Sequence, residues 1–313
     1  MKNFPYNTYS CFLKKKYGEK IYKLPIKINA TCPNRDGLLG YGGCIFCGIE
    51  GGSFENLNYN FSITEQLEIN REKISKKYGV NKFIAYFQNF TNTYIDLGKF
   101  KNMVEEAANS NNIVGISIST RPDCITRFHL DILKELEIEK NLDICLELGL
   151  QTANYQILKK LNRGHGLAEF IRAQKLIKEY GFESCVHIII GLPGENMEDV
   201  VETSKILSVL EVDFVKIHSL YILKNTALGK MYLKNKITLI EKQEYINRVI
   251  EFLRYLSSDI VVERVIGRAP EEDSLFCNWG NSWWVIRDEI IKIMTENGIY
   301  QGDKTFYMEG INK

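Results

Sequence analysis

Six short apolar segments recur along the chain, and longer stretches with helical periodicity separate them. Most of the segments are rich in β-branched residues, as buried strands are. They cover residues 24–28, 83–87, 113–118, 142–148, 186–190 and 214–217. Repeated alternation of strand and helix predicts a parallel sheet covered by helices.

Helix-start signals support this alternation. Ser62 and Glu65 have the spacing of a capping box, and Asn196 precedes two acidic residues at the start of another amphipathic stretch. Apolar residues at helical spacing in 245–256 predict a late helix.

One face of the predicted strands is polar, although a sheet buried on both faces is apolar on both. The polar positions are Tyr86, Gln88, Ser117, Ser119, Arg121, Glu147, Gln151, His187, Lys216 and His218. A polar inner face indicates a curved sheet around a lumen that holds a ligand. Because six strands are too few for a closed eight-stranded barrel, we predict an α/β fold with a partial (β/α)6 TIM-like barrel.

The barrel core is predicted over residues 24–226, with ligands at the carboxyl ends of its strands. A basic N-terminal arm, 1–23, precedes it, and a C-terminal helical segment, 227–313, packs on it. Residues 1–35 carry a net charge of +7, whereas the whole chain carries +1. This basic stretch is either a docking site for a polyanion or a solvated lysine-rich face.

Bulk composition indicates a soluble globular protein. Of 313 residues, 45% are hydrophobic and 25% are charged. No apolar run approaches the roughly 20 residues that span a bilayer, and the N-terminus lacks the apolar core of a signal peptide. We therefore expect a cytoplasmic protein without membrane contact.

Three of the eight cysteines form a cluster in the sequence. Eleven residues separate Cys32 from Cys44, and two more precede Cys47. A structural zinc site takes four protein ligands, whereas three thiolates leave one position open, as a four-iron cluster would. Cys145 and Cys185 lie in apolar runs and are predicted to be small buried side chains.

Several motifs together resemble the radical S-adenosylmethionine (SAM) enzymes. They are the cysteine loop, Ala85-Tyr-Phe-Gln-Asn-Phe, Ser119-Thr-Arg-Pro-Asp-Cys, Glu147-Leu-Gly-Leu-Gln-Thr, Asn162-Arg-Gly-His, Ile190-Gly-Leu-Pro-Gly-Glu and Lys216-Ile-His. The long first cysteine gap is typical of the Elongator-catalytic-subunit-like branch. Within it, the chain resembles the YhcC/YtqA-type subgroup.

The resemblance implies a [4Fe-4S] cluster held by Cys32, Cys44 and Cys47, with SAM on the fourth iron. Such a cluster cleaves SAM reductively and generates a 5′-deoxyadenosyl radical, with electrons from a low-potential donor of the flavodoxin or ferredoxin type. Zinc remains the alternative for the cysteines taken alone.

The resemblance also implies the SAM contacts. Gln151 is expected at the ribose and Arg163 at the methionine carboxylate, although a surface salt bridge is the alternative for Arg163. Main-chain groups from Gln88 and Asn89 are expected at the methionyl amine. Ser119 stands where many relatives have glutamate.

Two further positions are expected near SAM. Gly191 begins a turn beside the adenine, and His187 is either a ligand contact or a satisfied core residue. Glu147, Lys216 and His218 face the lumen and are the candidates for contact with substrate. A buried lysine needs a partner, which Glu147 or a substrate carboxylate could supply.

By resemblance, the expected function is modification of the aminomethyl-uridine side chain at the wobble position of tRNA. The alternative is a radical SAM enzyme acting on a small metabolite or a peptide, which would share every motif above. A non-catalytic metal-binding or SAM-binding module is the third possibility, and the charged lumen argues against it.

Overall fold

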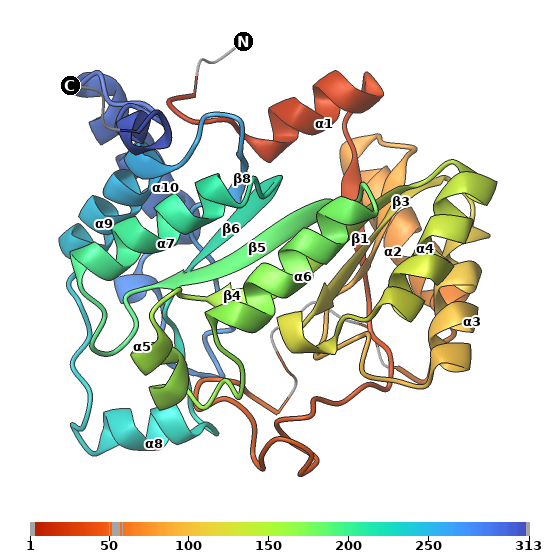
Figure 1. Ribbon diagram of the computed structural model, residues 1–313, viewed down its shortest axis with the longest axis horizontal. Helices are drawn as coiled ribbons and strands as arrows, with labels where there is room; N and C mark the ends of the chain where they lie inside the picture. The colour runs from red at the N-terminus through yellow and green to blue at the C-terminus, as the bar shows by residue number, and fades with distance from the viewer. Residues whose placement is uncertain (1–3, 50, 52–56, 58, 311–313) are drawn as a thin grey trace.

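The computed structural model describes residues 4–49, 51, 57 and 59–310. These residues form a curved, parallel, seven-stranded sheet in the order β1-β2-β3-β4-β5-β6-β8 (Figure 1). The strands are β1 (Tyr22–Ile26), β2 (Phe83–Phe87), β3 (Ile113–Thr120), β4 (Asp143–Gln151), β5 (Glu183–Ile190), β6 (Phe214–Ser219) and β8 (Val261–Arg264). The predicted partial barrel is confirmed.

All six predicted strands are present, and β8 adds a seventh that the sequence analysis missed. Its four residues include two charged ones, so the apolar run is too short to stand out. β8 pairs in parallel with β6, and a register shift after Val215 places Lys216 opposite Arg264. The added strand brings the polar side chains of β8 to the barrel interior.

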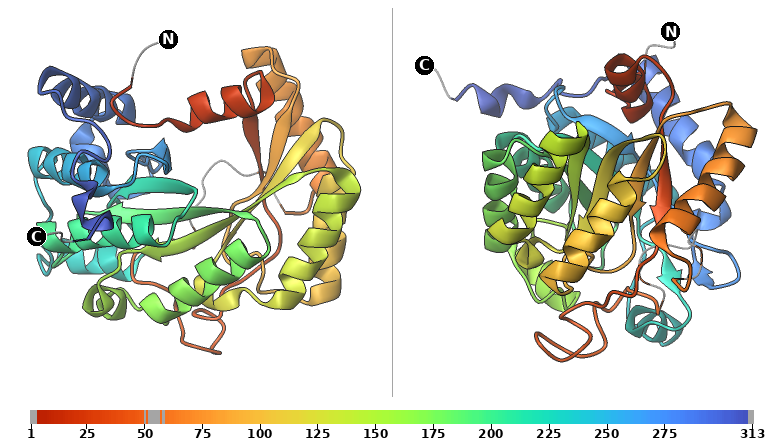
Figure 2. Two further views of the ribbon diagram at one scale, coloured as in Figure 1. Left: turned by 45° about the horizontal axis from the view of Figure 1, so that its top comes forward. Right: turned by 90° about the vertical axis from the view of Figure 1, so that its right-hand side faces the viewer.

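Helices cover the outer face of the sheet (Figures 1 and 2). They include α2 (Ile63–Tyr78), α3 (Leu97–Ala108), α4 (Arg127–Lys140), α6 (Leu167–Glu179), α7 (Met197–Val209) and α9 (Lys242–Tyr255). The predicted caps are present, because the Ser62 and Asn196 side chains accept backbone N–H groups of the first turns of α2 and α7.

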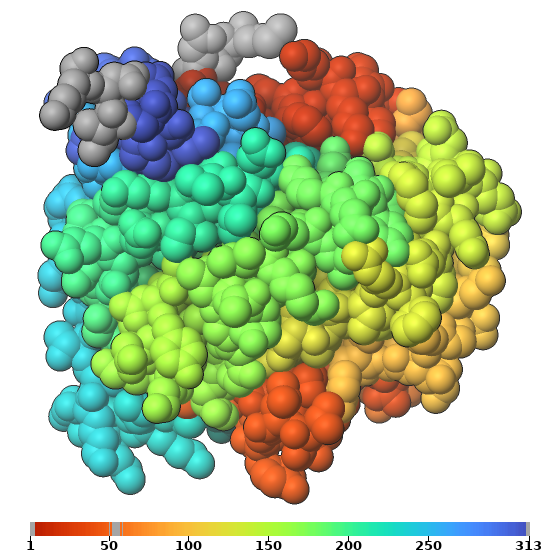
Figure 3. All heavy atoms as spheres, viewed as in Figure 1, coloured from red at the N-terminus to blue at the C-terminus, as the bar shows by residue number. Residues whose placement is uncertain are grey.

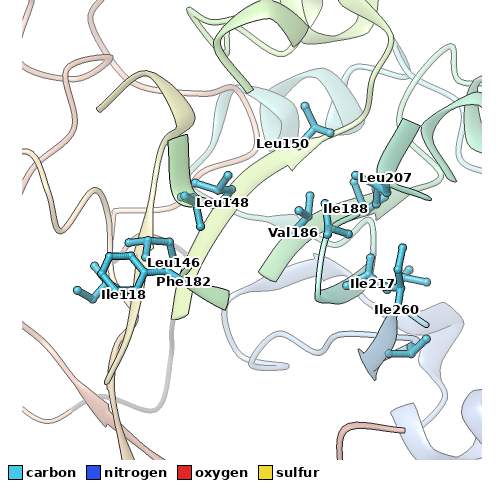
Figure 4. Packing of buried hydrophobic residues seen from close by; sticks show 14 of the residues in the cluster. Ile118, Leu146, Leu148, Leu150, Phe182, Val186, Ile188, Leu207, Ile217 and Ile260 are labelled. Carbon is cyan, nitrogen blue, oxygen red and sulfur yellow. The ribbon is translucent and has the colours of Figure 1, made fainter. Parts of the chain in front are cut away.

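The apolar side of the strands packs beneath these helices. Ile118, Leu146, Ile188 and Ile217 are at most 2% exposed and belong to one large hydrophobic cluster (Figure 4). Burying a side chain of this size contributes about 1.5–3 kcal/mol. The predicted two-sidedness of the strands, apolar outside and polar inside, is therefore confirmed.

The N-terminal helix α1 (Tyr9–Tyr17) closes the amino-terminal end of the half-barrel. Tyr9 and Phe12 pack edge-on against Phe214, beside Cys145 and Cys185, which are buried as predicted. Figure 2 shows α1 at the end of the barrel opposite the orange loop that follows β1. The basic arm thus forms part of the fold.

Two of the arm's lysines have acidic partners within the fold. Lys16 lies 2.8 Å from both Asp143 and Glu183, and Lys23 lies inside the barrel. Lys2 lies outside the described residues. Because α1 is far from the orange loop, the arm no longer argues for a polyanion at the ligand end.

The C-terminal segment packs on the barrel. Its elements are α8 (Ala227–Leu233), β9 (Ser274–Phe276), α10 (Trp283–Glu296) and short 3₁₀ turns at Asn278–Gly280 and Thr305–Met308, and β7 (Ile222–Leu223) leads into it. The remaining elements lie within the barrel core: α5 (Tyr155–Lys160) and a 3₁₀ turn at Pro122–Cys124. β7 pairs antiparallel with β9. Figure 3 shows the orange loop projecting at the lower edge of the molecule, not far from α8. No helix in the described part of the chain combines the length and apolarity needed to cross a bilayer.

Candidate active site

The loop after β1 presents the three cysteines at the carboxyl ends of the strands. Gly42 and Gly43 both have φ of +79°, a conformation that favours glycine, immediately before Cys44. The Cys47 N–H donates to the Cys44 carbonyl at 3.0 Å, so the Cys44–Cys47 segment forms a tight turn. The Ile45 N–H donates to the Leu161 carbonyl at 3.0 Å, which fixes the loop to the segment after α5.

All three cysteines line one cavity of about 1090 Å³, including its open mouth. A guanidinium faces each sulfur, from a different part of the chain. The pairs are Cys32 with Arg121 at 3.9 Å, Cys44 with Arg163 at 3.2 Å and Cys47 with Arg35 at 3.1 Å. A guanidinium beside each sulfur can donate to it and offset the negative charge that thiolate ligands bring to a metal or cluster.

This donor set fits an iron–sulfur cluster better than a closed zinc site. No fourth cysteine lines the cavity among the described residues. A metal or cluster held here would therefore keep a position open toward the cavity, where a second molecule could coordinate.

A buried ionic network forms the floor of the cavity around Glu147. The Glu147 carboxylate lies 2.7 Å from each of the Lys23 and Lys216 ammonium groups and 2.7 Å from Nε2 of His187. It also accepts the Tyr86 hydroxyl at 2.8 Å. Its side chain is fully buried, so the network provides every contact that water would otherwise make.

Glu263 completes the network from β8. Its carboxylate lies 2.8 Å from Lys23 and 3.2 Å from Lys216. Burial opposes the charge of both carboxyls, but the two lysines outweigh it and lower the pKa of Glu147 and of Glu263. Two carboxylates thus balance two ammonium groups.

Two histidines connect this floor to the mouth. The rings of His187 and His218 stack with centroids 5.3 Å apart. Burial lowers the pKa of both, assisted by the charge of Lys216 at His187 and of Arg264 at His218. Both imidazoles are therefore neutral at pH 7.

Most of the predicted SAM contacts line the cavity. Gln88, Ser119, Gln151 and Arg163 line the cavity. Besides Cys44, the Arg163 guanidinium contacts the Gly149 carbonyl at 2.6 Å, so it points inward, and its partners among the described residues include no surface carboxylate.

Gln151 has a φ of +80°, which is rare for a residue with a side chain and follows a register shift in β4. A Cβ on Gly149 would lie 2.9 Å from the Gln151 side-chain amide, so a larger residue there would displace this side chain from its position in the cavity.

Three predicted residues do not line the cavity. Asn89 is 1% exposed. The Gly191 N–H donates to Glu195 at 2.7 Å, and the turn there has a φ of +91°. Lys216 faces inward as predicted, but its ammonium group is occupied by Glu147 and Glu263.

Sequence analysis missed four charged residues of the site. Arg35 lies in the cysteine loop with no distinguishing pattern, and Lys23 was assigned to the basic arm. Lys23 could have been found, because it has the same strand parity as the other inward residues. Glu263 and Arg264 lie on the short strand that was not predicted.

Comparisons with known proteins agree with the geometry. Residues 28–207 match the Radical SAM superfamily, and residues 212–296 match its C-terminal domain. Protein YhcC of Escherichia coli is 32% identical, covering 94% of this chain and 93% of its own length. Protein YtqA of Bacillus subtilis is 33% identical, covering 95% and 92%.

Two further matches extend the comparison, one in fold and one in part of the sequence. The solved structure of Elp3 from Methanocaldococcus infernus superposes with a TM-score of 0.68 at 19% identity, covering 93% of this chain and 68% of that chain. The tRNA uridine(34) acetyltransferase of the same organism is 28% identical over 46% of this chain and 26% of its own length. The chain therefore belongs to the radical SAM superfamily, in its Elongator-like branch and YhcC-type subgroup, whose cofactors are a [4Fe-4S] cluster and SAM.

Proposed function

We propose that this radical SAM enzyme modifies the aminomethyl side chain of wobble uridine in tRNA. Support comes from the similarity of part of the chain to a tRNA uridine(34) acetyltransferase. The observation that carries the proposal is a cavity with two parts, a cysteine end and an ionic floor, that opens onto a second cavity. The second cavity leaves room for a large substrate beyond SAM.

In this proposal, Cys32, Cys44 and Cys47 hold the cluster through their thiolates. The cluster and SAM together supply hydrogen-atom abstraction, with electrons from a low-potential donor of the flavodoxin or ferredoxin type. Arg35 and Arg163 donate to the sulfurs and offset their negative charge.

In this proposal, residues that line the cavity and residues just outside it position SAM. Gln151 presents an amide that can both donate to and accept from ribose hydroxyls. Main-chain groups of Gln88 and Asn89 bind the methionyl amine, with Ser119 beside them. The turn at Gly191 lies near the adenine.

The residues of the ionic floor orient the side chains that contact the bound molecules. Glu147 fixes the His187 ring through a 2.7 Å contact, and Lys216 keeps Glu147 ionised. Both histidine rings line the cavity, and in this proposal His187 contacts SAM and His218 contacts the substrate. Glu147 and Lys216 act as positioning residues through these rings.

Turnover of defined tRNA tests the proposal. Anaerobically reconstituted protein with SAM, a reductant and tRNA should form 5′-deoxyadenosine and change the wobble nucleoside, as read by nucleoside mass spectrometry. The Cys44→Ala variant is the matched control, and it should do neither. Binding to tRNA should weaken steeply with added salt.

Two results would favour one of the alternative functions. Formation of 5′-deoxyadenosine without any change in tRNA, in the test tube or in a deletion strain, would favour a small metabolite or peptide as substrate. Absence of 5′-deoxyadenosine from fully loaded protein would indicate a binding module without catalysis.

A further inference from the structure

Arg35 connects the two ends of the cysteine loop. Its backbone N–H donates to the Cys32 carbonyl at 2.8 Å, so the residue follows the first cysteine in a tight turn. Its side chain extends to the last cysteine, where Nη2 lies 3.1 Å from Sγ of Cys47. One residue therefore contacts both the first and the third of the cysteines expected to hold the cluster.

The surroundings of Arg35 hold its guanidinium at this sulfur. The same Nη2 lies 3.2 Å from the Cys47 carbonyl and 2.5 Å from the Gly48 carbonyl. The guanidinium also lies over the Phe90 ring, with Cζ 5.3 Å from the ring centroid. A Cβ on Gly43 would lie 3.0 Å from Nε of Arg35, so glycine at this position leaves room for the arginine along the loop.

No acidic side chain in the described part of the chain offsets the charge of Arg35. Its contacts there are the Cys47 sulfur, two backbone carbonyls and an aromatic ring. A carbonyl oxygen carries only a partial charge and cannot neutralise a guanidinium. Arg35 therefore brings a full positive charge to the cysteines.

The other two guanidiniums beside the cysteines differ in this respect. Arg121 lies 3.9 Å from the sulfur that it faces, but it makes a two-point contact with Asp123 at 2.9 and 2.7 Å, so this pair is neutral. Arg163 is expected at the methionine carboxylate of SAM, which would neutralise it. Arg35 is thus the guanidinium of the three whose charge remains when SAM is bound.

We propose that Arg35 raises the reduction potential of the cluster through Cys47. The net charge of a cluster and the hydrogen bonds to its sulfurs set its potential. Reduction adds one negative charge, so a fixed cation that donates to a ligand sulfur stabilises the reduced form more than the oxidised form. A higher potential makes the reduced form, which SAM cleavage requires, accessible to a one-electron donor of low potential. Arg35 acts through Cys47 and is therefore a positioning residue.

A redox titration tests the proposal. Anaerobically reconstituted protein is titrated without SAM or substrate, and electron paramagnetic resonance follows the reduced cluster. Arg35→Gln keeps N–H donors but removes the charge. At a fixed potential it should lower the ratio of reduced to oxidised cluster about tenfold or more, which is a fall in reduction potential of about 59 mV or more. Arg35→Lys keeps the charge and should stay closer to wild type.

Two controls remove guanidiniums whose charge is offset. Arg127→Met removes an exposed guanidinium paired with Glu179 and should leave the reduction potential unchanged. The double variant Arg121→Met with Asp123→Asn removes a neutral pair beside the cysteines, so it should shift the potential less than Arg35→Gln does. An equal shift in the double variant would overturn the assignment to Arg35.

Iron content separates this role from a structural one. Arg35→Gln should hold four irons per chain, and a wild-type potential in that loaded variant would overturn the proposal. Failure of Arg35→Gln to hold four irons would make Arg35 a structural residue of the loop and would overturn it as well. Because the titration contains no substrate, a wild-type enzyme that leaves tRNA unchanged would refute the proposed function without affecting this inference.

Discussion

Replacing Lys216 with methionine tests whether the ionic floor is a balanced network. The substitution keeps an unbranched side chain of similar length but removes the ammonium group that lies 2.7 Å from Glu147 and 3.2 Å from Glu263. Two buried carboxylates would then share Lys23 alone. We expect a large loss in the free energy of unfolding.

The magnitude follows from these distances. At an effective dielectric constant of about 20, attractions at 2.7 and 3.2 Å are about 6 and about 5 kcal/mol. Much of this sum is offset by the cost of removing the ammonium group from water. Removing one partner of a buried ion pair costs about 3–5 kcal/mol, and we expect the loss in free energy of unfolding for Lys216→Met to lie in that range.

Urea unfolding followed by circular dichroism measures the effect. The control is Lys82→Met, which removes an ammonium group 3.0 Å from Glu19 in a pair whose side chains are 45% and 40% exposed. Exposed pairs contribute about 0–1 kcal/mol, so this variant should unfold almost as wild type does. A loss for Lys216→Met no greater than that of Lys82→Met would refute the reasoning.

The pH dependence gives a second check. The lysines lower the pKa of Glu147 and Glu263 in the folded protein, so their stabilisation is present above the unfolded pKa of about 4.3 and is lost as pH falls below it. Without Lys216, Glu147 or Glu263 takes up a proton more readily as the pH falls. The free energy of unfolding that Lys216→Met loses relative to wild type should therefore be largest near pH 8 and shrink toward pH 5. A loss that stays constant over this range would contradict this account.

Three further outcomes are expected. After anaerobic reconstitution, Cys44→Ala should hold fewer than four irons and should lose SAM cleavage. Iron analysis and a 5′-deoxyadenosine assay measure these two effects. A full four-iron cluster in this variant would mean that another residue is the ligand. Gly149→Ala places a Cβ 2.9 Å from Gln151 and 3.3 Å from Arg163, so SAM should bind about tenfold more weakly by calorimetry, whereas unchanged affinity would place SAM away from these side chains. Burial raises the pKa of Glu195 to about 8, so folding favours its protonated form and wild-type stability should fall relative to Glu195→Gln as pH rises from about 5 to 8. Parallel pH profiles for these two proteins would show that Glu195 stays ionised.

The sequence by itself determined the architecture, because strand and helix periods are local properties of the chain. Alternation of apolar and polar residues within single strands was enough to predict a curved sheet with a polar interior. Ile118 and Ile217 pack outward and Glu147 and His187 face inward, as their parity required. The three cysteines were also found from spacing alone.

The tertiary structure alone decided how the charges pair. Lys23 and Glu263 lie 240 residues apart in the chain, yet their side chains meet because β1 and β8 curve toward each other across the half-barrel. A sequence shows that a charge exists but not which opposite charge lies within 3 Å of it. Glu147 and a substrate carboxylate were both expected as partners of Lys216, and the fold pairs it with Glu147 and with the unforeseen Glu263. Arg264, on a strand too short to predict, faces the cavity.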